Sequence, residues 1–158
     1  MNKIKHINIK DLPSHHVCKH DVYEHYRQNF VTTVDGEAQD SLVAVYTLPP
    51  GKSNYPYHYH KKNEETFYII SGEGLLKTPE GEKKVSAGDL LFFPTGPEGA
   101  HKLTNCSETE NLVYIDFDVA HDLEVCIYPD TNKVGVIGKL GLGKFYPQDA
   151  NVDYYEGE

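Results

Sequence analysis

The chain of 158 residues has no tryptophan, one methionine and only three cysteines. Cys18, Cys106 and Cys126 are odd in number, far apart and never arranged as CxxC, which argues against a disulfide framework. Such sparse cysteine usage is typical of a reducing compartment. We therefore expect a cytoplasmic protein with small, unpaired thiols.

Basic residues are also scarce, with 15 Lys and Arg against 24 Asp and Glu and a formal net charge of −9. Nucleic acids and anionic membrane surfaces recruit Lys and Arg patches, so we expect neither as a partner. No apolar run approaches the length of a membrane span, and the opening MNKIKHINIKDL lacks the continuous apolar stretch of a signal peptide.

No window of helical length keeps a 3.6-residue apolar stripe; the polar segment Cys18–Asn29 is the only candidate for a short helix. Short β-prone runs bounded by Gly, Pro, Asn and Asp dominate instead. In two of them, apolar residues alternate with polar ones as in a half-buried strand, whose apolar side chains face the interior. The predicted strands are 41–48, 65–70, 75–78, 89–93, 111–118 and 123–128.

Many short strands at regular spacing predict an all-β sandwich or barrel in one domain. We expect an N-terminal arm with edge strands at 1–40, a β-barrel core at 41–128, and a glycine-rich tail packed on the barrel at 129–158. Within the arm, 3–9 and 30–34 are the β-prone segments. The run Gly135–Gly143 lacks the Gly-Lys-Ser/Thr ending of a phosphate loop, so it is interpreted as a connection.

A cluster of potential metal ligands occupies the middle of the chain. His58 and His60 are two residues apart, so a strand projects both from one face. After a short turn, Glu65 shares a face with the apolar Phe67 and Ile69, which makes it a better inward carboxylate than its neighbour Glu64. His101 likewise shares a face with Leu103.

The predicted site is therefore His58, His60, Glu65 and His101. Four polar groups facing an apolar interior would be costly to bury without partners. Three imidazoles and one carboxylate suit a divalent transition metal ion (Zn, Fe, Mn or Ni), with coordination positions left open. Such a site would keep a net positive charge of about one, which favours an anionic ligand.

These residues stand within two longer patterns that resemble the motifs of the cupin superfamily, and specifically of small bacterial single-domain cupins. The first pattern comprises Gly51, His58, His60, Glu65 and Gly72, and the second comprises Gly88, Pro94, Gly96, His101 and Asn105. The spacing between Gly96 and His101 is two residues longer than in the family's motif. The segment Pro97–Ala100 is therefore expected to enlarge the loop that precedes the third histidine.

The resemblance implies a double-stranded β-helix, a jelly-roll-like barrel that is commonly dimeric and carries its metal inside the barrel mouth. It does not fix an activity, because one fold hosts many functions. The first hypothesis is a metal-dependent enzyme of dioxygenase, isomerase or decarboxylase type, acting on a small anionic, oxygen-bearing metabolite. The alternative is a non-catalytic module that binds or senses a sugar or metabolite. No general acid or base and no organic cofactor site can be assigned.

Other candidate residues have simpler interpretations. A second group of histidines lies in a polar region where no carboxylate shares their spacing along a strand, which favours a solvated arm over a second metal site. These histidines are His15, His16, His20 and His25. Lys52, Lys61, Lys62 and Lys102 could form a cationic rim, although solvated turns are the commoner place for lysine. Parity places Cys106 opposite His101, and the tyrosines Tyr55, Tyr57 and Tyr59 favour packing over catalysis.

Overall fold

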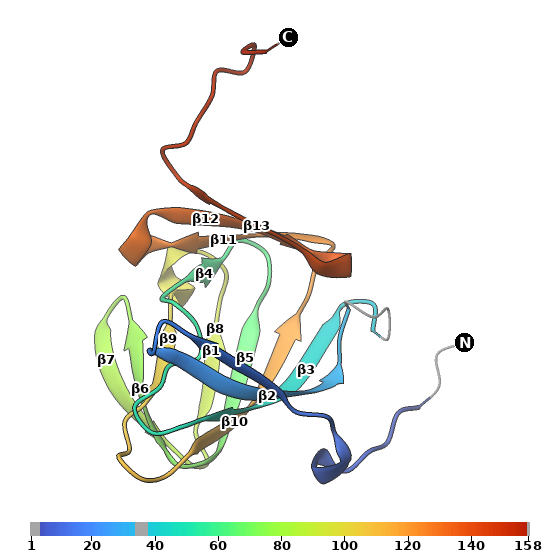
Figure 1. Ribbon diagram of the computed structural model, residues 1–158, viewed down its shortest axis with the longest axis vertical. Coiled ribbons are helices and arrows are strands. Elements are labelled where there is room, and N and C mark those ends of the chain that lie inside the picture. Colours follow the sequence, from blue (N-terminus) through green and yellow to red (C-terminus); the bar gives the residue numbers. More distant parts are fainter. Residues whose placement is uncertain (1–3, 34–37, 158) are drawn as a thin grey trace.

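The structure is a computed structural model that describes residues 4–33 and 38–157 (Figure 1). The described residues form strands and short 3-10 turns, with no α-helix among them. The all-β jelly-roll expectation is thus confirmed, although the sheets do not close into a continuous barrel. No helix in the described part of the chain has the length and apolar character needed to cross a membrane.

A six-stranded sheet forms one wall of the molecule, in the order β1-β2-β3-β10-β5-β8. All of its neighbouring strands are antiparallel. Its strands are β1 (His15–Lys19), β2 (Tyr23–Val31), β3 (Ser41–Leu48), β5 (Glu65–Ser71), β8 (Leu90–Phe93) and β10 (Leu112–Val119). β3 is rich in β-branched and aromatic residues, which favour strands, and it ends before Pro49, which cannot donate to a ladder.

Two smaller sheets complete the fold. The four-stranded sheet has the order β13-β12-β11-β4 and lies across one end of the molecule in Figure 1. Its strands are β4 (Tyr59–His60), β11 (Leu123–Tyr128), β12 (Lys133–Gly138) and β13 (Leu142–Pro147). The three-stranded sheet has the order β7-β6-β9 and contains β6 (Glu73–Thr78), β7 (Gly81–Ser86) and β9 (Lys102–Asn105). The 3-10 turns are η1 (Ile9–Asp11), η2 (Pro97–Gly99), η3 (Pro129–Thr131) and η4 (Lys139–Gly141).

The core lies between the sheets. Its fully buried side chains come mainly from the inward faces of β3, β5, β9 and β10, and the buried cluster is Ala44, Tyr46, Leu48, Phe67, Ile69, Leu76, Val85, Phe93, Leu103, Leu112 and Tyr114. Burial of this apolar area supplies the main favourable free energy of folding.

The N-terminal region differs from the sequence prediction. The segment considered for a helix, Cys18–Asn29, is the hairpin of β1 and β2, which turns at His20 and Asp21 with positive φ angles. β2 also pairs with β3, so cross-strand pairing along its whole length outweighs its polar composition. In the segment 3–9, residues 4–8 form no strand and Ile9 begins η1, whereas Phe30 and Val31 do belong to β2. Lys3 and Val34 lie outside the described residues.

The glycine-rich run is also not a connection. Most of it forms the hairpin of β12 and β13, in which Gly135 pairs with Phe145. A Cβ atom on Gly135 would lie 2.8 Å from the Phe145 ring, so glycine permits this close approach. Beyond β13, the last residues extend away from the sheets in Figure 1, and the side chain of Tyr154 is 86% exposed.

Candidate metal centre

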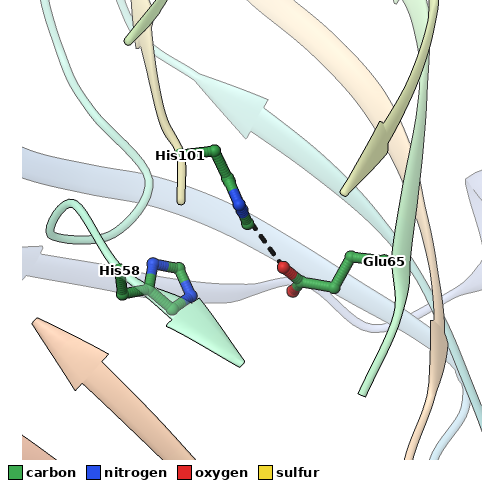
Figure 2. A group of neighbouring side chains, drawn as sticks. All are labelled: His58, Glu65 and His101. Carbon is green, nitrogen blue, oxygen red and sulfur yellow. Dashed lines mark ion pairs between the residues drawn. The ribbon is translucent and has the colours of Figure 1, made fainter. Parts of the chain in front are cut away.

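The four predicted ligands come from three neighbouring segments. His58 and His101 form an antiparallel bridge in which each backbone N–H donates to the other residue's carbonyl, at 3.2 and 2.9 Å. His60 lies on β4, two residues further along, and Glu65 begins β5. The side chains of His58, Glu65 and His101 are buried and point toward one another (Figure 2).

The loop before His101 contains η2 (Pro97–Gly99), a 3-10 turn inside the segment that is expected to be enlarged. Gly99 packs so tightly on this turn that a Cβ atom would lie 1.7 Å from the Pro94 carbonyl oxygen. Its own carbonyl oxygen lies 2.9 Å from His101 Nδ1. Gly99 therefore sets both the path of the loop and the orientation of the imidazole.

Each histidine uses its Nδ1 atom outside the cluster. The Pro56 and Gly99 carbonyl oxygens lie 2.8 and 2.9 Å from Nδ1 of His58 and His101, and a carbonyl can only accept a hydrogen bond. Nδ1 must then carry a proton, which in the neutral imidazole leaves Nε2 with a free lone pair. His60 Nδ1 lies 3.3 Å from Cys126 Sγ. This arrangement is the one commonly found around metal-binding histidines.

The Nε2 atoms converge on Glu65. Glu65 Oε2 lies 3.1 Å from His101 Nε2 and 3.4 Å from His60 Nε2, yet none of these three buried atoms makes a well-formed hydrogen bond. His58, Glu65 and His101 each place one potential ligand atom within 4.8 Å of the other two. His60 contacts Glu65 but lies outside this tightest group. The donors, their burial and their unsatisfied state fit a divalent transition metal ion.

The protonation equilibria also reflect this crowding. Burial, and then repulsion by His101, lower the pKa of His58 to about 4, which keeps its imidazole neutral. Burial alone would raise the pKa of Glu65, but the His101 and His60 rings hold it well below its usual range. Burial alone would lower the pKa of His60, but Glu65 raises it strongly. A carboxylate thus stands at the centre of the cluster.

Strand parity predicted the inward residues of the first motif correctly. Glu65, Phe67 and Ile69 are buried, whereas Glu64 is exposed. His101 and Leu103 are buried in the same way.

Parity was interpreted wrongly in the two strands where polar and apolar residues alternate. On β10 the inward residues are Asp116 and Asp118, while Phe117 is 44% exposed. On β11 Glu124 and Cys126 are buried, and Leu123 is 49% exposed. In both strands the polar side chains face the site, because cross-strand pairing places Asp118 opposite Glu65 of β5 and Cys126 opposite His60 of β4.

Glu124 was missed by the sequence analysis and supports the turn between His60 and Glu65. Its carboxylate accepts hydrogen bonds from the backbone N–H groups of Lys61, Lys62 and Asn63. Burial opposes ionisation, but His60 and these N–H groups lower the pKa of Glu124 to about 2. A single side chain on β11 therefore holds the turn that carries two of the predicted ligands.

Two adjoining cavities open beside the cluster. One, of about 270 Å³, is lined by His58, His60 and Glu65 together with Asp116 and Asp118. The other has a volume of about 340 Å³. The residues that line both are Arg27, Leu42, His60, Asp118 and Ile137.

Charged groups missed by the sequence analysis line these cavities: Arg27 and Asp118 line both, and Asp116 lines the one at the metal centre. The Arg27 guanidinium lies 5.5 Å from the Tyr46 ring centroid. Burial, and then the neighbouring Asp118, raise the pKa of Asp116 well above its usual range. Burial, and then Glu65, raise the pKa of Asp118 to about 7.

The remaining candidates lie elsewhere. His25 is not part of a solvated arm but is buried, with ring centroids 5.3 Å from Tyr46 and 5.1 Å from Tyr55. His16 does have a carboxylate partner, Glu24, at 3.0 Å across the hairpin. Hairpin pairing, invisible in the linear sequence, explains both differences. His15 and His20 are exposed.

The four lysines of the expected cationic rim are not among the residues that line either cavity. Lys52 Nζ donates to the Asp21 carbonyl oxygen, and Lys102 lies over the Tyr23 ring. Cys106 is exposed. Arg27 lines both cavities, and Lys139 lines the larger of the two.

Comparison with known proteins agrees with the fold and the motifs. Residues 44–118 match the family model described as a cupin domain. The chain therefore contains a cupin domain in this segment, and its fold and motifs resemble those of the cupin superfamily.

Individual relatives are more distant. The chain is 33% identical over 69 residues to an oxalate-binding protein of Thermotoga maritima, a match that covers 44% of this chain and 54% of that protein. The chain thus spans about half the length of the curated relatives that it matches. A proposed sugar phosphate isomerase from Acidithiobacillus ferrooxidans has a similar structure, with a TM-score of 0.74, 25% identity and 92% of each chain covered. A sugar phosphate isomerase from Silicibacter pomeroyi superposes with a TM-score of 0.79 over 96% of this chain and 98% of that one, at 17% identity, and shows the fold alone.

Proposed function

We propose that this cupin binds one divalent first-row transition metal ion through His58, His60, Glu65 and His101. The observation that carries the proposal is the convergence of buried, unsatisfied Nε2 atoms on the Glu65 carboxylate, while Nδ1 of each histidine is engaged elsewhere. Leaving such atoms without partners would cost about 1–3 kcal/mol each, a cost that a bound cation removes.

We propose further that the protein is a metal-dependent enzyme that acts on a small anionic, oxygen-bearing metabolite. When bound, the ion supplies Lewis-acid chemistry at a ligand oxygen. The protein's own part is to hold the ligand beside Glu65, in a cavity of a size that suits a small metabolite. The names of the oxalate-binding relative and of the proposed sugar phosphate isomerase support an oxygen-rich anion as the ligand class.

The second candidate is a non-catalytic module that binds or senses such a ligand in the same cavity. It is favoured by one relative, which is named for binding and not for turnover. Assaying the metal-loaded protein with sugar phosphates, keto acids and dicarboxylates separates the two candidates. Turnover that disappears in a metal-site variant supports the enzyme, and saturable binding without turnover supports the module.

Metal analysis of untagged protein tests the centre itself. We expect about one ion per chain after dialysis, and its loss in the double variant His58→Ala/His60→Ala. His15→Ala/His20→Ala is the matched control, because these two histidines are exposed. Full occupancy in the first double variant would contradict the proposal.

We also propose that the protein is a cytoplasmic homodimer. All three cysteines are free, which supports a reducing compartment. β1 and β8 stand at the edges of the six-stranded sheet, and on β8 Leu90 and Phe92 are 72% and 59% exposed. A second copy of the chain would cover such an edge and its apolar neighbours.

A further inference from the structure

Five buried polar atoms outside the predicted ligand set have no hydrogen-bond partner in the described structure. One of them, His25 Nδ1, belongs to a residue that lines neither cavity beside the predicted metal centre. The other four line those cavities and are Arg27 Nε, Asn29 Oδ1, Asp116 Oδ1 and Asp118 Oδ1. Folded proteins leave few such atoms unsatisfied, and each one costs about 1–3 kcal/mol unless something binds it. Asp116 is only 4% exposed, so bulk water does not serve it.

These atoms belong to one wall. Asn29 and Asp116 both pair with Ala44 of β3, from opposite sides, and therefore stand in one row across the sheet. Arg27 lies one inward position along β2 from Asn29, and Asp118 lies one inward position along β10 from Asp116. Arg27 and Asp118 line both cavities, Asp116 lines the one at the metal centre, and Asn29 lines the other.

The wall is continuous with the predicted metal centre. Oxygen atoms of Glu65, Asp116 and Asp118 lie within 4.8 Å of one another, and Asp118 is the direct cross-strand partner of Glu65. A ligand held by the ion would therefore extend along these side chains.

The chemistry of the four atoms selects the ligand. Asn29 Oδ1 can only accept a hydrogen bond and the charged Arg27 Nε–H group can only donate one, whereas an aspartate oxygen accepts when ionised and can donate when protonated. A second cation would satisfy the two carboxylates but not the Arg27 Nε–H group. A simple anion would satisfy Arg27 but would face the acceptor oxygen of Asn29. A hydroxyl group donates one hydrogen bond and accepts others, so a row of hydroxyl groups can satisfy all four atoms.

We propose that Arg27, Asn29, Asp116 and Asp118 form a subsite for a polyhydroxylated ligand, a sugar or a polyhydroxy acid, whose hydroxyl groups donate to the acceptors and whose oxygens accept from Arg27. This inference deepens the proposed function and rests on it, because the other end of the ligand is taken to bind the metal ion. The preference for hydroxyl groups resides in the protein side chains and not in the ion.

Binding of matched pairs of compounds tests the subsite. Calorimetry on the full chain, loaded with nickel and again after dialysis against chelator, compares glycerate with propionate, gluconate with hexanoate, and galactarate with adipate. Each pair shares chain length and charge and differs in hydroxyl groups. We expect the hydroxylated member of at least one pair to bind about tenfold or more tightly in the nickel-loaded protein.

Two variants locate the preference. Asn29→Leu and Asp116→Asn should each weaken binding of the preferred compound about tenfold while leaving the nickel content near one ion per chain. The matched controls Asn151→Leu and Asp149→Asn change exposed residues of the C-terminal tail and should leave binding unchanged. Circular dichroism confirms that each variant is folded. The variants are needed because a 2-hydroxy acid can also chelate nickel through its hydroxyl and carboxylate oxygens, and only loss of the preference in the variants assigns it to the side chains.

Equal binding within every pair would overturn the inference, as would a preference that survives both variants. Two nickel ions per chain, with the second lost in Asp116→Asn, would also overturn it in favour of a second cation site. Failure of the proposed function looks different: the unchanged protein would hold no metal. A hydroxyl preference that depends on Asn29 in such metal-free protein would still support the subsite.

Discussion

Replacing Glu124 by Gln tests whether this carboxylate holds the turn between β4 and β5. Oε1 lies 3.0 Å from Lys61 N and 2.6 Å from Val125 N, while Oε2 lies 3.0 Å from Lys62 N and also accepts from Asn63 N. Glutamine keeps the shape of the side chain but turns one acceptor into an NH2 group. That group would face backbone N–H donors, so the hydrogen bonds on that side would be replaced by repulsion between donors.

The pKa of Glu124 gives the magnitude. Its fall from 4.5 to about 2, caused by His60 and then by the backbone N–H groups, corresponds to about 3 kcal/mol of preference for the ionised form in the folded, metal-free protein. We therefore expect Glu124→Gln to lower the free energy of unfolding at pH 7 by about 3 kcal/mol. With a slope near 2 kcal/mol per molar urea, the unfolding midpoint would fall by about 1–2 M.

The assay is urea unfolding followed by circular dichroism, with metal retention measured in parallel. Because the turn carries His60 at one end and Glu65 at the other, the variant should also retain less metal after dialysis. Glu64→Gln is the control, since it removes a charge from the same turn at an exposed position. Equal midpoints for the two variants would refute the reasoning.

The same residue predicts the effect of pH. The pKa of Glu124 is lower in the folded state, so its contribution is fully present above about pH 4.5 and declines as pH falls toward 2. The difference in unfolding free energy between the unchanged protein and Glu124→Gln should shrink over this range. A constant difference from pH 7 to pH 2.5 would contradict the assignment.

The other predictions concern the carboxylate ligand, the loop before His101 and assembly. Glu65→Gln should lose most of its metal on dialysis while Glu64→Gln keeps it, because only the first side chain is buried; elemental analysis of the two side by side decides, and loss from both would exclude parity as the cause. Gly99→Ala should destabilise the protein by about 1–3 kcal/mol through its clash in the loop, lowering the thermal midpoint by several degrees, whereas Gly143→Ala meets only an ordinary contact; equal midpoints would show that the loop adapts. Light scattering should report twice the chain mass of 17.9 kDa at micromolar concentration, and the mass of one chain would exclude the homodimer.

The metal-ligand candidates could be located from sequence because their signal is local. His58 and His60 stand two residues apart, and Glu65 follows in phase with Phe67, so a two-residue period was enough to turn all three inward. His101 needed only its phase with Leu103. The unusual His58–His101 backbone bridge depends on tertiary pairing and had no local signal.

The rest of the cavity wall was not predictable in this way, because its strands have apolar residues on both faces. On β10, Leu112 and Tyr114 share the inward phase with Asp116, while Ile115 and Phe117 occupy the other phase. Burial of Leu112 and Tyr114 in the core fixes the phase, and it turns the carboxylates inward as well. Leu112 and Tyr114 were therefore the signal that could have found Asp116.

Arg27 was missed for a different reason. The segment that contains it is polar and was considered as a helix, and only its pairing with β3 makes it a strand. The partner of a strand is chosen by the whole chain, so local pattern alone could not place this residue beside the site.

The position of β10 between β3 and β5 has a consequence for how the protein is made. A nascent chain that has grown as far as residue 100 already contains three of the four predicted ligands, but it lacks both the third histidine and the central strand of the largest sheet. Pairing of β3 with β10 joins segments distant in the sequence, which makes folding slow compared with helical proteins of similar size. At about 5–20 residues per second, synthesis leaves β3 and β5 with unpaired edges for seconds. The proposed four-ligand metal site therefore cannot be complete before His101 has been synthesised, and a metal ion held by all four ligands would mark a chain that has folded at least that far.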